Sequence, residues 1–370
     1  MKNKFVIVLG LVFFVGCSTT SYLKYEREKE LRKNEEFEKK VVIKPVVDVT
    51  PVTPVPTTEA TQTTGTTPPN VISETIDQTI HQITDKEAPK PPFKTKPAKT
   101  VKPAKSKKGE KDNLVLVAPV VRQPDIEDTE GFAPGSRRPL VDPFRMNEKV
   151  IHSVRYFSAE AGLLTFHVKP MVEVNSRKSY QFYIGLKTSS LFSKFYSVDD
   201  YVETFLDYET LVPHVFKMNA RETGKLVQAN SYFDHQSLKA TFWEKKYTEK
   251  NGEEIKNQVW DLLPFSQNAF SGLFYMRLFK WEIGKEYSFR VSDDEKNVVF
   301  KGVAEKKEVI ETDAGEFKAI KIKALVFSRG ALTPTGNIYF WLSDDSRKLI
   351  LRIVAEIKIG KLVSEVVEID

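Results

Sequence analysis

Residues 349–359, LILRIVAEIKI, decide the fold class of this chain. Apolar residues occupy every second position, and Arg352, Glu356 and Lys358 alternate with them. Successive side chains of a strand point to opposite faces, so this period of two predicts a strand with one buried and one solvated face. Sheets with one solvated face are commonly antiparallel. The stretch therefore predicts a mainly β fold built on antiparallel sheet.

The same alternation recurs at residues 287–291, 320–326 and 338–342. Turn-forming residues separate the apolar runs, as at Asn251 and Gly252, where a hairpin is expected. Roughly ten or more consecutive strands predict an antiparallel barrel-like or strongly curved meander sheet, because closure removes exposed edges. A two-sheet sandwich is the alternative.

Two short segments, residues 189–198 and 268–279, have the apolar spacing of helices. We therefore expect one or two short helices beside the sheet. The second segment carries Arg277 among apolar neighbours, and a charge in such a place must reach solvent or find an acid. Asp261 and Asp344 are the expected partners.

Composition divides the chain into two parts. Sixteen of the 20 prolines lie between Pro45 and Pro143, whereas all four tryptophans and 18 of the 25 phenylalanines lie beyond residue 150. A chain folds only where it can bury enough apolar surface to offset the entropy of ordering. We therefore expect residues 150–370 to form one β-rich globular domain and residues 17–149 to form a disordered Pro/Thr/Lys-rich tether.

The expected tether begins with a charged segment, residues 22–40, in which pairs such as Glu36 and Lys40 have helix-supporting spacing. Its apolar residues, Phe37 among them, are too sparse to form a stripe, so we expect a short solvated helix; a coiled-coil partner is the alternative. About 100 flexible residues have a root-mean-square span near 50–60 Å. Such a tether would let the domain lie well away from its anchor.

Residues 86–111 hold ten lysines and two glutamates. The net positive charge of this segment, ten minus two, exceeds the net charge of +6 of the whole chain. This basic run lacks the interleaved aromatic side chains that stack on bases, so we expect no nucleic-acid partner. Anionic cell-wall polymer or lipid headgroups would be attracted by unspecific electrostatics. A soluble, self-repelling spacer explains the same composition.

The N-terminus indicates export. Lys2 and Lys4 precede an apolar run over residues 5–15, about half the length that a spanning helix needs, so residues 1–16 are predicted to be a signal peptide. Gly16 precedes Cys17, the only cysteine of the chain. A lone cysteine excludes an intramolecular disulfide and any Cys-rich metal site.

The residues around Cys17 resemble the lipobox of bacterial lipoproteins, although Phe14 stands where leucine is usual. The resemblance implies a lipid, such as palmitate, on Cys17 and a membrane-anchored protein of the cell envelope. Ser18 favours the outer membrane, facing the periplasm, by analogy with lipoprotein sorting in enteric bacteria. An ordinary secretory signal with an incidental cysteine is the alternative.

Four short motifs, spread over the second part of the chain, occur in a recognisable order. They are GLFYMR at residues 272–277, Gly284 and Lys285 before a strand, GEF at residues 315–317 and WLSDD at residues 341–345. In this order they resemble bacterial envelope proteins of the domain of unknown function 3108 family, over about residues 150 to 370. The resemblance implies an antiparallel barrel-like fold and supplies no catalytic residues.

The chain has none of the common local signatures of catalysis or of cofactor binding. It lacks the HExxH zinc motif, a phosphate-binding glycine-rich loop and the GxSxG nucleophile elbow, so we expect no catalytic residue, metal or cofactor. Acidic pairs such as Asp199 and Asp200 lie at predicted strand ends, where aspartate caps turns. Single histidines on predicted strands are expected to be structural: His152, His167, His214 and His235.

Two functions remain. The first is a non-catalytic binding or assembly module, with cell-wall polymer, a lipid or an envelope protein as partner. The candidate ligand-lining residues are Trp243, Phe274, Arg277 and Trp341. The alternative is an envelope hydrolase that acts on glycan or peptide through carboxylates assembled by the fold.

Overall fold

The structure is a computed structural model that describes part of the chain. The described residues are 34–46, 130–156, 159–328, 331–332, 337–357 and 360–370. The predicted signal peptide, Cys17 and most of the expected tether, including its lysine-rich run, lie outside them. The described residues on both sides of the gap at 47–129 belong to one compact unit.

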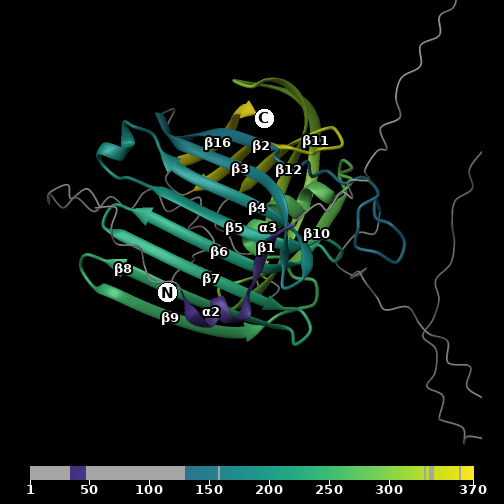
Figure 1. The fold of residues 1–370 in the computed structure, drawn as a ribbon. Coiled ribbons are helices and arrows are strands. Elements are labelled where there is room, and N and C mark those ends of the chain that lie inside the picture. The colour runs from purple at the N-terminus through teal and green to yellow at the C-terminus, as the bar shows by residue number, and fades with distance from the viewer. Residues whose placement is uncertain (1–33, 47–129, 157–158, 329–330, 333–336, 358–359) are drawn as a thin grey trace, which may run out of the picture. The chain divides into compact units, whose positions relative to one another are not determined.

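One antiparallel sheet of sixteen strands forms this unit (Figure 1). Its first half is a meander of β2 (Lys149–Tyr156), β3 (Ala159–Val174), β4 (Arg177–Thr188), β5 (Asp199–Asp207), β6 (Pro213–Glu222), β7 (Lys225–Asp234), β8 (Lys239–Thr248) and β9 (Gly252–Asp261). Its second half contains β10 (Glu286–Asp293), β11 (Lys296–Thr312), β12 (Gly315–Ser328), β14 (Ile338–Ser343), β15 (Ile350–Ile357) and β16 (Gly360–Ile369), with the short β13 (Ala331–Leu332) beside β12. Pairing of β16 with β2 joins the two halves. The predicted barrel-like meander is confirmed, and the sandwich is wrong.

The sheet curves without closing, because its end strands β9 and β10 do not pair in a ladder. Side chains and the connection between these strands link the two edges instead. Trp260 Nε1 donates to Ser292 Oγ over 2.8 Å, and Asn297 Nδ2 donates to the Asp261 carbonyl over 2.8 Å. The backbone N–H of Ser292 donates to the Gln267 carbonyl over 2.7 Å. These contacts cover part of the edges that an open sheet leaves exposed.

The stretch that predicted the sheet behaves as expected. In β15, Leu351, Ile353 and Ala355 are buried in the core, whereas Arg352 lies on the other face and forms an ion pair with Glu365 of β16. The alternation therefore places one row of side chains inside the curved sheet.

The helix predicted at residues 268–279 is α3 (Ala269–Tyr275), which continues into the 3-10 turn η2 (Met276–Leu278). Asn268 begins it with a capping box: its Oδ1 accepts from the Ser271 N–H, and Ser271 Oγ accepts from the Asn268 N–H. The other predicted helix, at residues 189–198, is only the 3-10 turn η1 (Phe192–Lys194).

Helix α3 fills the concave side of the sheet. Phe274 stacks on Phe182 of β4 at 4.1 Å between ring centroids, and Phe270 stacks on Phe216 of β6 at 5.2 Å. A Cβ on Gly272 would lie 3.2 Å from the ring of Phe289 in β10, so glycine permits the close approach of helix and strand. The interior is therefore a packed aromatic core.

The folded unit includes more of the chain than its expected start near residue 150. Residues 130–148 pack against one end of the sheet, where Phe144 contacts Phe182 edge-on at 4.8 Å and Glu148 is buried. Residues 34–46 form α2 (Glu35–Lys40) and β1 (Ile43–Pro45), which also lie on the sheet. The expected solvated helix is wrong at Phe37, whose side chain is only 1% exposed. Among the described helices, none combines the length and the apolar character needed to span a membrane.

Candidate functional site

The four residues predicted to line a ligand site lie in different places. Phe274 is inside the core, and Arg277 is in a buried ion pair. Trp243 belongs to a separate apolar cluster. Trp341 lies between Lys321 and Arg352, and its Nε1 donates to Glu308 Oε1 over 2.8 Å. The fold therefore gives these four residues structural contacts and no common cavity among the described residues.

Arg277 finds a different acid from the two that were expected. Its Nη1 lies 2.7 Å from Glu148 Oε1, and the two side chains are 3% and 2% exposed. The expected partners are engaged elsewhere, since Asp344 pairs with Lys307 and Asp261 with Lys239. The prediction failed because Glu148 lies in the segment that was assigned to the tether.

The buried guanidinium of Arg277 is fully hydrogen-bonded. It donates to the carbonyl oxygens of Arg347 at 2.9 Å and Pro143 at 3.2 Å, and it lies over the ring of Phe144. A buried charge that has both an ion-pair partner and these acceptors is satisfied. The pair therefore joins α3 to residues 130–148 as a structural contact.

His152 is structural, as expected. Its Nε2 lies 2.8 Å from the Ile350 carbonyl and its Nδ1 lies 2.9 Å from Ser364 Oγ, so one ring nitrogen donates and the other accepts. Burial lowers the pKa of His152 to about 4. The neutral ring thus links three neighbouring strands at ordinary pH.

His214 and His235 are closer together than their positions in the sequence indicate. Their rings lie 5.6 Å apart, and His214 Nε2 is 3.9 Å from Asp207 Oδ2. Burial lowers the pKa of both imidazoles, that of His214 to about 4. No group of three or more His, Cys, Asp or Glu side chains in the described part of the chain is arranged to hold a metal ion.

One acidic pair is unexpected. Asp200, at the start of β5, lies near Glu222, at the end of the neighbouring strand β6. Burial and the charge of Glu222 raise the pKa of Asp200 to about 7. Lys225 Nζ donates to Glu222 Oε1 over 2.5 Å, and Tyr196 donates to Glu222 Oε2. The Arg221 N–H donates to Asp200 Oδ1 over 2.8 Å. Sequence reasoning missed this pair because it is set by strand register.

The feature best suited to binding is an apolar cluster on the outer face of the sheet, called the outer groove below. The outer groove is the apolar cluster formed by Val172, Val174, Phe205, Val215, Tyr232 and Trp243. Residues 34–46, called the strap below, occupy it, and Figure 1 shows α2 and β1 lying across the strands. The groove therefore holds a segment of chain that is far from it in sequence.

The helical half of the strap inserts one aromatic side chain. Phe37 contacts Trp243 edge-on, at 5.9 Å between ring centroids, and the Lys217 ammonium lies 5.4 Å from the Phe37 ring. Trp243 Nε1 donates to Glu36 Oε2 over 2.8 Å. Asn34 caps the helix by accepting from the Phe37 N–H, which is a start signal that the sequence does contain.

The extended half of the strap adds a strand. Ile43 and Pro45 pair with Val174 and Val172 in the last residues of β3. Strand β3 continues beyond its pairing with β2, which ends at His167, so this edge is available to β1. The contact is strand addition, in which backbone hydrogen bonds supply affinity whatever the side chains.

Asn175 at the tip of the β3–β4 hairpin fastens the two halves of the strap. Its φ of 48°, followed by 65° at Ser176, suits the two-residue turn. Its Oδ1 accepts from the Val42 N–H over 2.9 Å, its own N–H donates to the Val42 carbonyl over 2.9 Å, and its Nδ2 donates to the Lys40 carbonyl over 3.0 Å. Three hydrogen bonds therefore meet at one asparagine.

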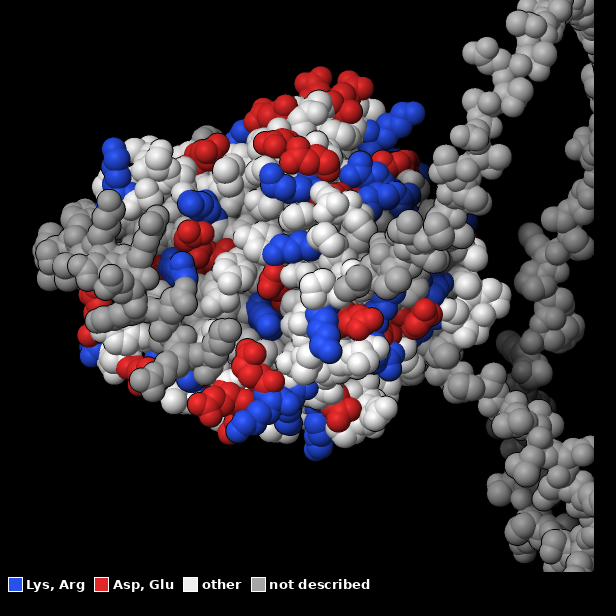
Figure 2. All heavy atoms as spheres, in the orientation of Figure 1, with Lys and Arg blue, Asp and Glu red and all other residues white. Residues whose placement is uncertain are grey.

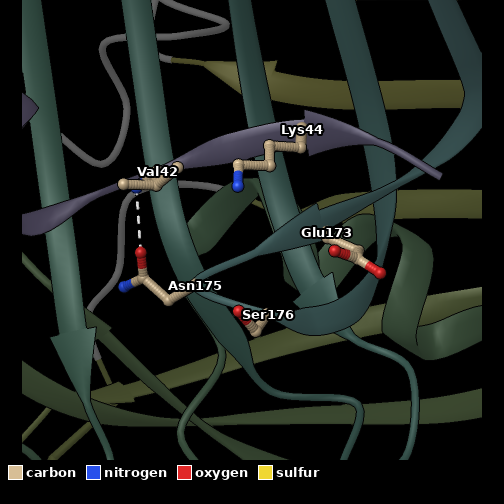
Figure 3. A pocket seen from close by; sticks show the side chains of 5 residues that line it. All are labelled: Val42, Lys44, Glu173, Asn175 and Ser176. Carbon is tan, nitrogen blue, oxygen red and sulfur yellow. Dashed lines mark hydrogen bonds between the residues drawn. The ribbon is translucent and has the colours of Figure 1, made fainter.

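A polar hollow of about 290 Å³ lies beside this fastening (Figure 3). It is lined by Val42 and Lys44 from the strap and by Glu173, Asn175 and Ser176 from the hairpin. Since the strap supplies part of the wall, the hollow depends on the strap being bound. Figure 2 shows acidic and basic side chains interspersed over the described part of this face, without a continuous patch of one sign.

These features define a barrel-like antiparallel meander with a packed interior and an occupied outer groove. The family model for "Protein of unknown function (DUF3108)" matches residues 152–367, more than half of the chain. The chain belongs to this family, as the motif order predicted. The strap and residues 130–148 lie outside the matched range.

Three solved structures are similar to the chain at 12% identity. One is a β-barrel-like protein of domain of unknown function 1849 from Brucella abortus, with a TM-score of 0.37. The match covers 60% of this chain and 96% of that protein. A protein provisionally described as a lipoprotein, from Parabacteroides distasonis, has a TM-score of 0.29, with coverage of 62% and 99%. A protein provisionally described as exported, with a YmcC-like fold, from Bacteroides fragilis, has a TM-score of 0.25, with coverage of 62% and 98%. No curated protein matches the chain.

Proposed function

We propose that this protein is an envelope lipoprotein, anchored through a lipid on Cys17 to the outer membrane and facing the periplasm, whose domain acts by binding. The observation that carries the binding function is the occupied outer groove. A chain segment is held there by strand addition at β3, an edge-on aromatic contact with Trp243 and three hydrogen bonds at Asn175. This combination is a known mode of peptide recognition.

The packed interior supports a binding surface on the outside of the sheet. Helix α3 and its aromatic contacts fill the concave side, where a barrel-like protein would otherwise enclose a ligand. The mixed charges of Figure 2 are not typical of a surface that attracts nucleic acid. An extended peptide segment, from an envelope protein or from the chain itself, therefore fits the groove best.

Peptide binding is tested with the full chain carrying Phe37→Asp, which removes the aromatic side chain of the strap and vacates the groove. A labelled synthetic peptide of residues 34–46 should bind this variant, as measured by fluorescence anisotropy. The wild-type chain should bind the peptide less, because its groove is occupied. The same peptide with Phe37→Asp is the matched control, and equal weak binding of both peptides to the variant chain would refute the groove as a binding site.

The anchor is tested by Cys17→Ala. The wild-type protein should partition with membranes and carry label from a radioactive fatty acid, and the variant should move to the soluble envelope fraction. Membrane association of the variant without lipid label would refute the lipoprotein proposal.

A glycan or peptide hydrolase is the second candidate, and the pair of Asp200 and Glu222 favours it. A carboxyl group whose pKa is about 7 suits a general acid. Against this role, Lys225, Tyr196 and the Arg221 N–H already engage the two carboxyl groups. We therefore expect the variants Asp200→Asn and Glu222→Gln to complement a deletion strain as the wild-type protein does. Failure of both well-folded variants to complement it would favour the hydrolase.

A further inference from the structure

We infer that the strap is the point at which the lipid-anchored end of the chain joins the domain, so that it holds the domain close to its anchor. This inference rests on the proposed lipid at Cys17 and on the occupied groove. It replaces the long tether that composition predicts with a short connection.

The order of attachment points along the chain carries the inference. The first described residues, 34–46, lie on the folded unit, and the chain is described again from Glu130, in the same compact unit. The described residues that flank the 83 residues numbered 47–129 therefore both lie on this unit. The ten lysines of residues 86–111 belong to this connection. No part of that basic run therefore lies between the anchor and the strap.

Chain length fixes how far the domain can lie from the lipid. Seventeen residue steps separate Cys17 from Asn34, and a fully extended chain spans at most about 3.3–3.6 Å per residue, or roughly 60 Å. With the strap released, the first attachment would be at Glu130, after 113 steps and roughly 380 Å of extended chain. Docking of thirteen residues thus shortens the maximal reach about sixfold.

The contacts of the strap are those of a specific docking site. Phe37 is almost completely buried, Asn175 makes three hydrogen bonds to the backbone of Lys40 and Val42, and Lys44 stands opposite Glu173 in the β1–β3 pairing. An attached segment has an effective concentration on the order of millimolar, so even modest affinity keeps it bound. The strap of the same chain is therefore the occupant to which we commit.

An engineered disulfide tests the docking. Lys44→Cys with Glu173→Cys places two thiols on directly opposite residues, whose Cα separation in an antiparallel pair is about 4.5–5.5 Å and suits a disulfide. The control is Lys44→Cys with Asp199→Cys. Asp207, at the end of β5, pairs with Ser179 near the β3–β4 hairpin that holds the strap, whereas Asp199 lies eight residues away at the start of β5. Each pair is made in the full chain, both with Cys17 and with Cys17→Ala.

We expect the first pair to form an intramolecular disulfide in most molecules, whether or not Cys17 is present, and the control pair to form little. Adding Phe37→Asp should reduce cross-linking severalfold. No cross-link in the first pair, or a cross-link mainly between two chains, would overturn the inference.

A cut within residues 47–129 then tests the connection to the membrane. A site for a specific protease, inserted after Gly65, is cleaved in membranes that carry the cross-linked protein. The fragment that contains the domain should stay with the membrane until a reductant is added. Release before reduction, with the N-terminal fragment still cross-linked, would show that the strap docks but that the lipid anchor is wrong, so the two proposals fail separately.

Discussion

Two short helices bury aromatic side chains against opposite faces of the same sheet. Helix α3 lies on the concave side with five of its seven residues buried, and α2 lies on the outer face with only Phe37 of its six residues buried. Both begin at an asparagine cap. A cap therefore begins a helix in both places, whereas the amount of buried surface decides how much the stability of the fold depends on that helix.

The strongest test of this comparison is Phe274→Ala. Removing a fully buried aromatic side chain that stacks on Phe182 should lower the free energy of unfolding by about 3–5 kcal/mol, since it leaves a cavity in the core. Urea denaturation followed by fluorescence measures the change. A loss below about 1 kcal/mol would contradict the packed interior.

Arg277→Met should have the next largest effect, because it leaves Glu148 buried and without its main partner. We expect a loss of about 3 kcal/mol in the free energy of unfolding, at the lower end for a broken buried pair because Arg347 still contacts Glu148. The matched control is the double variant Arg277→Met with Glu148→Leu, which should recover part of the loss. Strictly additive losses would show that the two side chains are not coupled.

Acid should destabilise the domain through its buried histidines. An imidazole whose folded pKa is about 4, against about 6.5 in the unfolded chain, contributes stability that is present above pH 6.5 and lost as the pH falls toward 4. For His152 the loss at pH 5 is roughly 2 kcal/mol. Thermal unfolding between pH 7 and pH 4 measures the slope, and His152→Gln should flatten it.

Asp200 should oppose this trend, and it provides an internal control. Its raised pKa of about 7 means that the folded state holds a proton which the unfolded state releases, so this carboxyl destabilises the fold as the pH rises from 4 to 7. Asp200→Asn should therefore increase stability at pH 7 and steepen the loss in acid. An unchanged pH profile would contradict the raised pKa.

The smallest effect is expected for Phe37→Ala, on the other side of the comparison. Burial of this ring contributes about 2–3 kcal/mol, and closure of the 83-residue connection opposes it, so the net loss in unfolding free energy should be on the order of 1 kcal/mol. Hydrogen exchange should report the change locally: the amides of Val41 and Val42 should exchange faster than in the wild type, and the exchange rates in β7 should be unchanged. A loss as large as that of Phe274→Ala would erase the distinction between strap and core.

The sequence predicts those parts of the fold that depend on local periodicity. Alternation at residues 349–359 identified a strand with one buried face, and the spacing at residues 268–279 identified the helix that fills the core. The order of four short motifs identified the family. Each of these signals is contained within a few residues or in their order along the chain.

The features that were missed depend on contacts between distant residues. Phe37 is a single apolar side chain in a polar segment, and strand addition at β3 uses backbone groups that no composition reveals. Glu148 meets Arg277 across more than 120 residues, and Asp200 meets Glu222 through strand register. The residues of each pair are 129 and 22 positions apart, beyond the reach of local periodicity, so the sequence alone does not bring them together.

The two ends of residues 47–129 have a consequence for how this protein can change. An insertion or deletion in a tether moves the tethered domain, but one in a loop held at both ends leaves the distance between lipid and domain unaltered. Under the strap arrangement, the Pro/Thr/Lys-rich connection is free to lengthen, shorten or exchange its composition. The seventeen steps between Cys17 and Asn34 carry the constraint on length instead.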